Sequence, residues 1–457
     1  MSDFIGFAGA IILPAAIGLL ALSVWGDIFY RFHHGERLVY ALGLGFGILT
    51  LIMFLFSCFH LRFPPPLIIF VVLIPLVILR KMFFKAVEPE KAAPSSPGNL
   101  PERLLWLIII FVVIFVVFRA FMIERELWDG WAVWNFKGRI YSFHQRIPLE
   151  EFPQLSKVWG NWDYPHHVPL MEAWASLCLG RWHENWMRLV FPMFWIASGA
   201  GVYFFLLRSV NRMTALMGLF CFVTLGKLQQ MVIGSIAEPV VIFYYLTSLV
   251  LLVRWREDNN TNFFTLSAVM AGLACWTKNE GFAYTLFNLI TIVLLLSEKD
   301  IVRGIKQVAW YSFIVIAMNA PWILVKNILG LKNIHLNEGT LSLPYLMGNL
   351  GHVPEVLSAF LQYTVWWSYF NIVWFAFALT LMVNAQCLKD RHCKIVVVSI
   401  CLNLSMIIGM GILEPSAQYL QDAMGRLLVT PAVLAIIFMI LAQRGRFAGT
   451  STTAGPV

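Results

Sequence analysis

Apolar runs separated by short polar segments recur along almost the whole chain. A helix of roughly 20 apolar residues spans a bilayer. The runs predict helices at 4–26, 39–61, 65–84, 103–122, 187–207, 213–227, 238–254, 262–277, 281–297, 307–327, 367–386, 394–413 and 426–442. We therefore expect an all-α polytopic membrane protein with about thirteen transmembrane helices.

Lysine and arginine gather in every second polar segment. They lie in segments 27–38, 80–103, 208–212, 254–257, 298–306, 387–394 and 443–446. Short basic loops stay on the cytoplasmic side of a membrane. These segments are therefore expected inside, with the N-terminus outside and the C-terminus inside, as an odd number of spans requires.

Two segments are too long and too polar for turns between spans. Residues 88–102 are rich in Pro, Ser and charge and predict a flexible cytoplasmic linker between an N-terminal three-helix unit, 1–87, and a membrane core, 103–442. Residues 123–186 fall on the outer face and carry eight of the 18 tryptophans. Long loops are usually functional, and residues 443–457 are expected to form a cytoplasmic tail.

Composition narrows the class of protein. The chain is 59% hydrophobic and 13% charged, which excludes a water-soluble enzyme, a coiled coil and a disordered protein. The net charge of +8 is spread over short loops, so no nucleic-acid partner is expected. The first residues lack the basic region of a cleaved signal peptide, and the first helix is expected to be retained.

The seven cysteines lie mostly in apolar segments and predict no structural disulfide. Only Cys387, His392 and Cys393 cluster, on a short basic loop, where a metal site is a weak alternative.

The outer loop opens with three carboxylates at the membrane boundary: Glu124, Glu126 and Asp129. The spacing of Trp131, Trp134 and Tyr141 is compatible with the aromatic face of a helix lying in the membrane interface. In the plainer alternative, Asp129 caps that helix and the glutamates are solvated.

The loop ends in Trp162-Asp163-Tyr164-Pro165-His166-His167. The prolines and the aspartate predict a rigid turn into a helix. His166 and His167 could bind a metal, but no third ligand is evident. The alternative is a turn with two interface histidines.

Three further polar groups interrupt apolar helices on the same predicted side: Glu238, the turn Lys278-Asn279-Glu280, and Arg426. A charge at bilayer depth is costly and usually faces protein or a water-filled cavity. Each alone could be a helix-terminal or snorkelling residue. Together they predict one cavity open to the outside and to the outer leaflet.

Four stretches, in chain order, resemble the membrane-embedded C-type (GT-C) glycosyltransferases: WDGWAVWNFKGRIYS, DYPHHVPLMEAWASL, SIAEPVVIFYY and TKNEGFAY. This superfamily includes the protein O-mannosyltransferases and the aminoarabinose transferase that acts on lipid A. The resemblance covers about residues 103–442. It implies a bacterial cytoplasmic-membrane enzyme with an early outer loop of interfacial helices. Its active site would face the exterior and use a polyprenyl-phosphate sugar donor.

The resemblance also implies residue roles. Asp129 matches the acidic residue that acts as catalytic base, and Asp163 lies in the second loop motif. Lys278 and Arg426 match basic positions that hold the lipid-phosphate leaving group, whereas Glu238 stands where many members have Asp. No large outer domain follows the last helix, which favours a lipid-linked or glycan acceptor over a folded protein.

The chemistry requires a carboxylate that takes the acceptor's proton and fixed cations where phosphate charge develops. Asp129 and Asp163 are the expected catalytic residues. The expected substrate-binding residues are Glu124, Glu126, Trp128, Trp131, Lys137, Tyr164, His166, His167, Glu238, Lys278, Asn279, Glu280 and Arg426.

Two other functions stay open at this point. A flippase for lipid-linked sugars should carry internal repeats with polar residues near mid-membrane, and none is evident. A polysaccharide polymerase or ligase usually has its large loop late in the chain. The sequence also leaves metal dependence open, since Glu124, Glu126 and Asp129 could hold a divalent ion through oxygen ligands.

Overall fold

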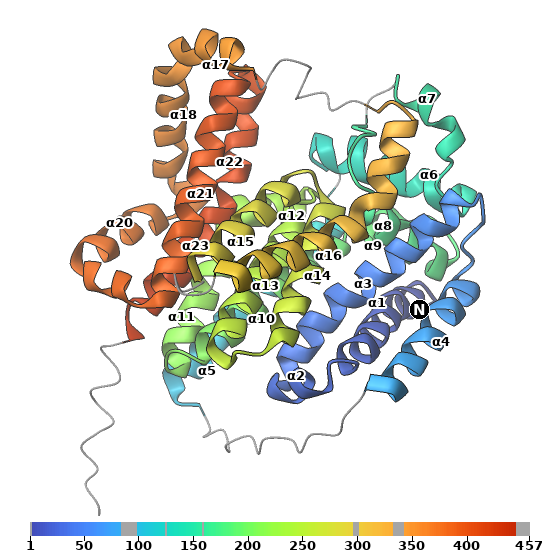
Figure 1. The fold of residues 1–457 in the computed structure, drawn as a ribbon, viewed down its shortest axis with the longest axis horizontal. Helices are drawn as coiled ribbons and strands as arrows, with labels where there is room; N and C mark the ends of the chain where they lie inside the picture. Colours follow the sequence, from blue (N-terminus) through green and yellow to red (C-terminus); the bar gives the residue numbers. More distant parts are fainter. Residues whose placement is uncertain are drawn as a thin grey trace, which may run out of the picture. The chain divides into compact units, whose positions relative to one another are not determined.

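The computed structural model describes residues 2–83, 98–123, 126–157, 160–295, 301–331 and 342–444. Within these residues every regular element is a helix (Figure 1). Helices occupy all thirteen of the predicted apolar runs. The all-α fold class is thereby confirmed.

Nine helical segments among the described residues are long and apolar enough to cross a membrane. They are α1 (Ser2–Ser23), α3 (His34–Cys58), α4 (Pro65–Phe83), α5 (Leu100–Met122), α9 with α10 (Glu184–Met187, Val190–Leu207), α13 (Glu238–Asp258), α16 (Ile301–Ile328), α21 (Arg391–Leu413), and η5 through α23 (Tyr419–Ala423, Met424–Leu427, Val429–Leu441). The protein is therefore a multi-pass membrane protein.

The remaining four predicted spans are shorter or bent. The first is a pair, α11 (Arg212–Val223) and α12 (Gly226–Ile233), bent by 56°. The others are α14 (Thr261–Thr277), α15 (Glu280–Leu295) and α20 (Val373–Val383). A total of thirteen crossings stays a prediction.

The chain divides into two compact units. The first comprises 1–97, 115–201 and 232–331, and the second comprises 98–114, 202–231 and 332–457. Helices α1 and α3 pack on each other and on α8 (His167–Leu179), within the first unit. The N-terminal helices therefore share a unit with later segments, which differs from the predicted division at the linker. That linker and the predicted C-terminal tail lie mostly outside the described residues.

Helix α13 forms the centre of the first unit. Its apolar window is entirely buried, and it packs on α14 and α15. Buried polar groups find partners here: Ser248 Oγ lies 2.9 Å from the Tyr311 hydroxyl and accepts from Asn288 Nδ2 at 2.8 Å. Such bonds hold apolar helices together where association in lipid lacks a hydrophobic driving force.

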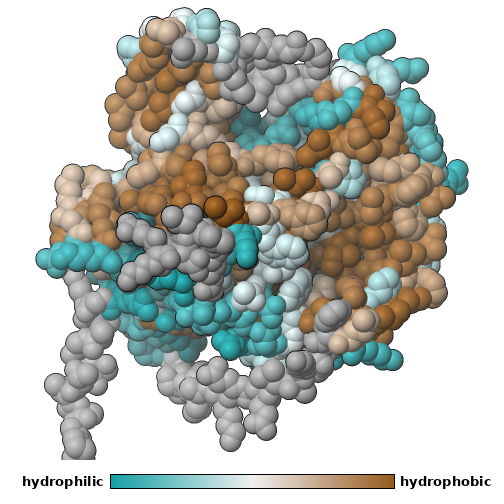
Figure 2. All heavy atoms as spheres, in the orientation of Figure 1, coloured by the Kyte–Doolittle hydropathy of each residue, from teal (hydrophilic) through white to brown (hydrophobic). Residues whose placement is uncertain are grey.

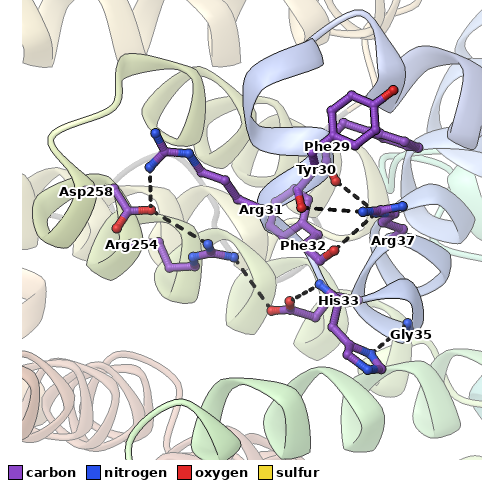
Figure 3. A network of polar contacts seen from close by, with 10 residues as sticks. Phe29, Tyr30, Arg31, Phe32, His33, Gly35, Arg37, Arg254 and Asp258 are labelled. Atoms are coloured by element: carbon purple, nitrogen blue, oxygen red, sulfur yellow. Dashed lines mark hydrogen bonds and ion pairs between the residues drawn. The ribbon is translucent and has the colours of Figure 1, made fainter. Parts of the chain in front are cut away.

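An ion-pair network ties the end of α13 to the start of α3 (Figure 3). Arg254 lies 3.7 Å from both Glu36 and Asp258, and Arg31 at the end of α2 (Gly26–Arg31) lies 3.5 Å from Asp258. Glu36 also closes a capping box with His33. This network holds the C-terminal end of α13 against the start of α3.

The described residues of the predicted outer loop, 123, 126–157 and 160–186, form short helices. They are η1 (Gly130–Asn135), a π-helical turn, α6 (Phe136–His144), η2 (Leu149–Glu151), α7 (Phe152–Leu155), α8, and the start of α9. The predicted helices are present, and their position in the membrane interface stays a prediction.

The second unit is built around α21 and α23, with α11 and α20 packed on α23. Its other described elements include α17 (Leu343–Asn349), η3 (Leu350–His352), α18 (Val353–Val365), α19 (Trp367–Phe370) and η4 (Ala385–Lys389). Leu361 and Val365 of α18 are 60% and 78% exposed, and Figure 2 shows apolar side chains over this helix. Such a surface suits contact with lipid.

Candidate functional site

Lys278 lies between two carboxylates at the ends of three helices. It follows the last residue of α14, Glu280 opens α15, and Glu238 opens α13. The Lys278 ammonium is 3.1 Å from Glu238 Oε1 and 2.8 Å from Glu280 Oε1. Both Lys278 and Glu238 are buried. One ammonium therefore contacts the carboxylates at the starts of two helices.

The turn that carries Lys278 is tight because α14 and α15 approach closely. A Cβ built on Gly281 would lie 2.2 Å from the backbone carbonyl atoms of Ala274. Real Cβ atoms do not come that near to backbone, so only glycine fits there. The sequence therefore fixes the direction of Lys278, Asn279 and Glu280.

Asp163 comes from the turn before α8 and is 2% exposed. Asn279 Nδ2 donates to its Oδ2 at 3.1 Å, and Lys326 Nζ of α16 lies 3.6 Å from the same oxygen. Its Oδ1 is buried without a hydrogen-bond partner among the described residues. The sequence predicted Asp163 and Asn279 for the site and missed Lys326.

Lys137 of α6 is fully buried and donates from Nζ to the Asn161 carbonyl at 2.8 Å. Its ammonium also lies 5.6 and 5.5 Å from the ring centroids of Trp134 and Trp162. Burial lowers the pKa of Lys137 to about 7, and the negative charge of Asp163 opposes that shift. The side chain can therefore exchange a proton near neutral pH.

Tyr164 is influenced by charges from both the outer loop and the turn between α14 and α15. Burial raises the pKa of the Tyr164 hydroxyl first, and the nearby charge of Glu280 raises it next. Lys278 lowers that pKa, whereas Asp163 and Asp129 raise it. Charges from the two ends of the loop and from the α14–α15 turn therefore all influence the pKa of this hydroxyl. We call Asp129, Lys137, Asp163, Tyr164, Glu238, Lys278, Asn279, Glu280 and Lys326 the charged cluster.

Asp129 stands at the N-cap position of η1, but its side chain makes no capping hydrogen bond. The alternative reading of Asp129 as a helix cap therefore has no bond to support it. The residue is half-buried. Beside it, the rings of Trp128 and Trp131 are 57% and 42% exposed and meet edge to face at 4.9 Å.

The predicted aromatic face of Trp131, Trp134 and Tyr141 is wrong. Trp134 and Tyr141 are buried at 1% and 0% exposure, and only Trp131 is exposed. The cause is the π-helical turn η1, whose wider spacing moves side chains off the 3.6-residue register on which the prediction depended. Trp134 stacks on Tyr164 instead.

His166 and His167 are fully buried and reach different partners. His166 Nδ1 lies 2.9 Å from the Tyr141 hydroxyl, and His167 lies 2.7 Å from Thr50 Oγ1 and 2.9 Å from the Tyr244 hydroxyl. Burial lowers both histidine pKa values, that of His167 to about 3. Both rings are neutral at pH 7, and their hydrogen bonds serve the packing of α8.

Glu126 lies in a buried ion pair with Arg188 of the α9–α10 segment and accepts a hydrogen bond from Asn135. Burial raises the pKa of Glu126, and Arg188 opposes the shift. Sequence reasoning missed Arg188 because it precedes an apolar run, where a snorkelling arginine is common. The other predicted glutamate, Glu124, lies outside the described residues.

Arg426 belongs to the second unit. It lies 3.4 Å from Asp422 Oδ2, while Lys227, at the start of α12, lies 3.7 Å from Asp422 Oδ1. The Lys227 ammonium also sits 4.4 Å from the Tyr369 ring centroid, and the residue is buried. Sequence reasoning missed Lys227, because a lysine at the end of an apolar run is common as a flanking cation.

No three histidine, cysteine or acidic side chains gather closely enough to hold a metal ion, as far as the described residues go. This applies to Cys387, His392 and Cys393. Asp129 and Glu126 likewise form no such group in the described part of the loop.

No family model, no curated protein and no solved structure matches this chain.

Proposed function

We propose that the protein is a glycosyltransferase of the C-type, located in a bacterial cytoplasmic membrane with its site facing the exterior. It transfers a sugar from a polyprenyl-phosphate donor to a lipid-linked or glycan acceptor. The observation that carries this proposal is the charged cluster: carboxylates, lysines and a tyrosine gathered from one polar loop and three helix ends of a multi-pass membrane protein.

Asp129 is the proposed general base. Its carboxylate takes the proton of the acceptor hydroxyl while the acceptor oxygen bonds to the anomeric carbon of the sugar. The bond from that carbon to the phosphate oxygen breaks, and its electron pair leaves on polyprenyl phosphate. A single in-line displacement inverts the anomeric carbon without a covalent intermediate. Phosphate leaves as an anion and needs no general acid, so one carboxylate acting as base is sufficient. The half-buried position of Asp129 beside the exposed rings of Trp128 and Trp131 supports this role.

Asp163 is proposed to act through its neighbours. Its hydrogen bond from Asn279 and its contact with Lys326 hold it rigidly, and its charge raises the proton affinity of Lys137. A carboxylate held in this way suits orientation of a substrate hydroxyl or of a lysine.

The leaving phosphate requires cations where its charge develops. We propose Lys278 and Arg426, which the resemblance assigns to this role, as phosphate-binding residues. Lys227 is proposed with them, because its ammonium lies 3.7 Å from Asp422, the carboxylate that Arg426 also contacts.

A transport assay and a transfer assay on the same preparation test the proposal. The purified protein in proteoliposomes is given a panel of polyprenyl-phosphate hexoses and pentoses, labelled in the sugar, with membrane extract as acceptor. Label should move from the lipid donor to a new product. Donor that crosses the bilayer without any new glycosidic bond would show a flippase instead.

A further inference from the structure

A separate cavity of about 520 Å³ opens beside η1, within the first unit. Three aromatic rings line it: Trp131, Phe136 and Trp182. Ligand-binding cavities typically measure about 300–1,000 Å³ and combine aromatic walls with a few polar groups. This cavity therefore has the size for one sugar unit with a substituent.

Its polar wall is held in place by the buried ion pair of Glu126 and Arg188. Asn135 donates to Glu126 through its Nδ2. The second carboxylate beside Arg188 is Glu184, at 3.7 Å. Arg188 therefore contacts two carboxylates, and Arg139 is the second cation of the lining.

Three polar groups of the lining have no partner among the described residues. Asn135 Oδ1 and Trp182 Nε1 are buried without a hydrogen bond. Arg139, one helical turn beyond Phe136, is exposed and makes no ion pair with a described residue. The residues of the aromatic lining therefore include an acceptor, Asn135 Oδ1, and a donor, Trp182 Nε1, that lack partners among the described residues. The guanidinium of Arg139 is the third polar group that a ligand could engage.

A saccharide fits this combination. The C–H face of a sugar ring packs on indole and phenyl rings, and its hydroxyls both donate and accept hydrogen bonds, as Asn135 and Trp182 require. Arg139 adds a planar fork that binds a carboxylate or phosphate through two parallel bonds. A lipid chain would leave these polar groups unsatisfied.

We propose that this cavity binds an anionic saccharide unit, a sugar ring that carries a carboxylate or phosphate on the side of Arg139. In the glycosyltransferase, this cavity would be the subsite for the acceptor, and that role rests on the proposed function. Binding itself requires no turnover and stands independently.

The test measures binding of four probes to the protein in nanodiscs by ligand-observed NMR: methyl glucuronide, glucose 6-phosphate, methyl glucoside and inorganic phosphate. The two anionic sugars should bind about tenfold more tightly than methyl glucoside, the usual effect of one charged hydrogen-bond pair. Glucuronide and glucose 6-phosphate together reveal which anion is preferred.

Arg139→Gln should abolish the preference for anionic sugars, and Trp182→Phe should weaken all three sugars several-fold. Lys157→Gln, which removes an exposed cation from the same loop, is the matched control and should change nothing. Equal affinity for charged and neutral sugars would overturn the proposal, as would inorganic phosphate binding as tightly as glucose 6-phosphate.

Asp129→Asn separates this inference from the proposed function. The variant should bind the anionic sugars as the wild type does. If it also transferred sugar at the wild-type rate, the role of Asp129 would fail while the saccharide site stood.

Discussion

At the scale of single residues, burial decides the behaviour of Glu172. This residue of α8 is fully buried, and neither of its carboxylate oxygens has a hydrogen-bond partner in the described part of the chain. Burial raises the Glu172 pKa well above its usual value, and the charge of Glu126 adds to the shift. The side chain is therefore neutral in the folded protein.

Glu172→Gln should stabilise the protein at pH 8. The unfolded chain loses the Glu172 proton near pH 4 while the folded protein keeps it, so this group's contribution to stability falls as pH rises between the two pKa values. Glutamine does not ionise, so the variant does not lose stability in this way as pH rises. The loss in the wild type is at most about 1.4 kcal/mol per pH unit. The melting temperature of the Glu172→Gln protein should be about 1–3 °C above that of the wild type at pH 8, and the two should differ little at pH 5.

Glu151→Gln is the control, since Glu151 lies half-exposed on the same loop and should show no pH-dependent gain. A Glu172→Gln protein that melts below the wild type at pH 8 would mean that the folded protein ionises Glu172.

Single charged residues in apolar surroundings were visible in the sequence, and their pairing was not. Lys278 stands out because charge at a membrane helix end is costly, and Asp163 stands out because it lies in the turn that ends the polar loop. The bond from Asn279 to Asp163 joins residues 116 positions apart, and periodicity carries no information about such contacts. Arg188, Lys227 and Lys326 were missed for the same reason: each is an ordinary flanking cation until its partner is known.

At the scale of elements, helices were predictable and their irregularities were not. Each of the thirteen apolar runs contains a helix in the structure, because about 20 consecutive apolar residues are typical of a helix that spans a membrane. The π-helical turn η1 and the 56° bend between α11 and α12 depend on tertiary packing. They decide where Trp134 and Lys227 point.

The close approach of α14 and α15 gives an element-scale prediction. Gly281→Ala should destabilise the protein by at least about 1–3 kcal/mol, the usual cost of overpacking, because the new methyl group meets backbone that cannot move aside. Gly9→Ala is the matched control, since nothing lies within 4 Å of its Cβ position. Fluorescence-detected thermal unfolding measures both. Equal melting temperatures for the two variants would contradict the tight-turn account.

The break between α11 and α12 gives a second element-scale prediction. Lys227 lies in the first turn of α12, where the helix dipole disfavours a cation, so an anion beside it is expected. Lys227→Met and Arg426→Met should each weaken binding of a polyprenyl-phosphate sugar about tenfold or more. Lys278→Met should also weaken donor binding, and it should lower the melting temperature as well, because Glu238 and Glu280 would lose their shared cation. Wild-type donor affinity in both unit-two variants would refute the phosphate assignment.

At the scale of the whole molecule, the alternation of basic loops predicts that 123–186 faces the exterior. Phe143 is 84% exposed, whereas neighbouring Ser142 is half-buried and bonded to Ser176. In a cysteine-free background, Phe143→Cys should react with a membrane-impermeant maleimide in sealed cells. Lys389→Cys, exposed on a predicted cytoplasmic loop, should react only after permeabilisation. The reverse pattern would invert the topology.

The central claim is that Asp129 is the general base of sugar transfer, and single-turnover transfer by Asp129→Asn tests it most directly. Asparagine keeps the shape and cannot accept the proton. With donor binding and folding confirmed for the variant, the account predicts a rate about 10²–10⁴-fold below wild type. Loss of a helix cap would cost only about 1 kcal/mol of stability and leave the rate intact. Transfer at a near wild-type rate by folded, donor-bound Asp129→Asn protein would contradict the account.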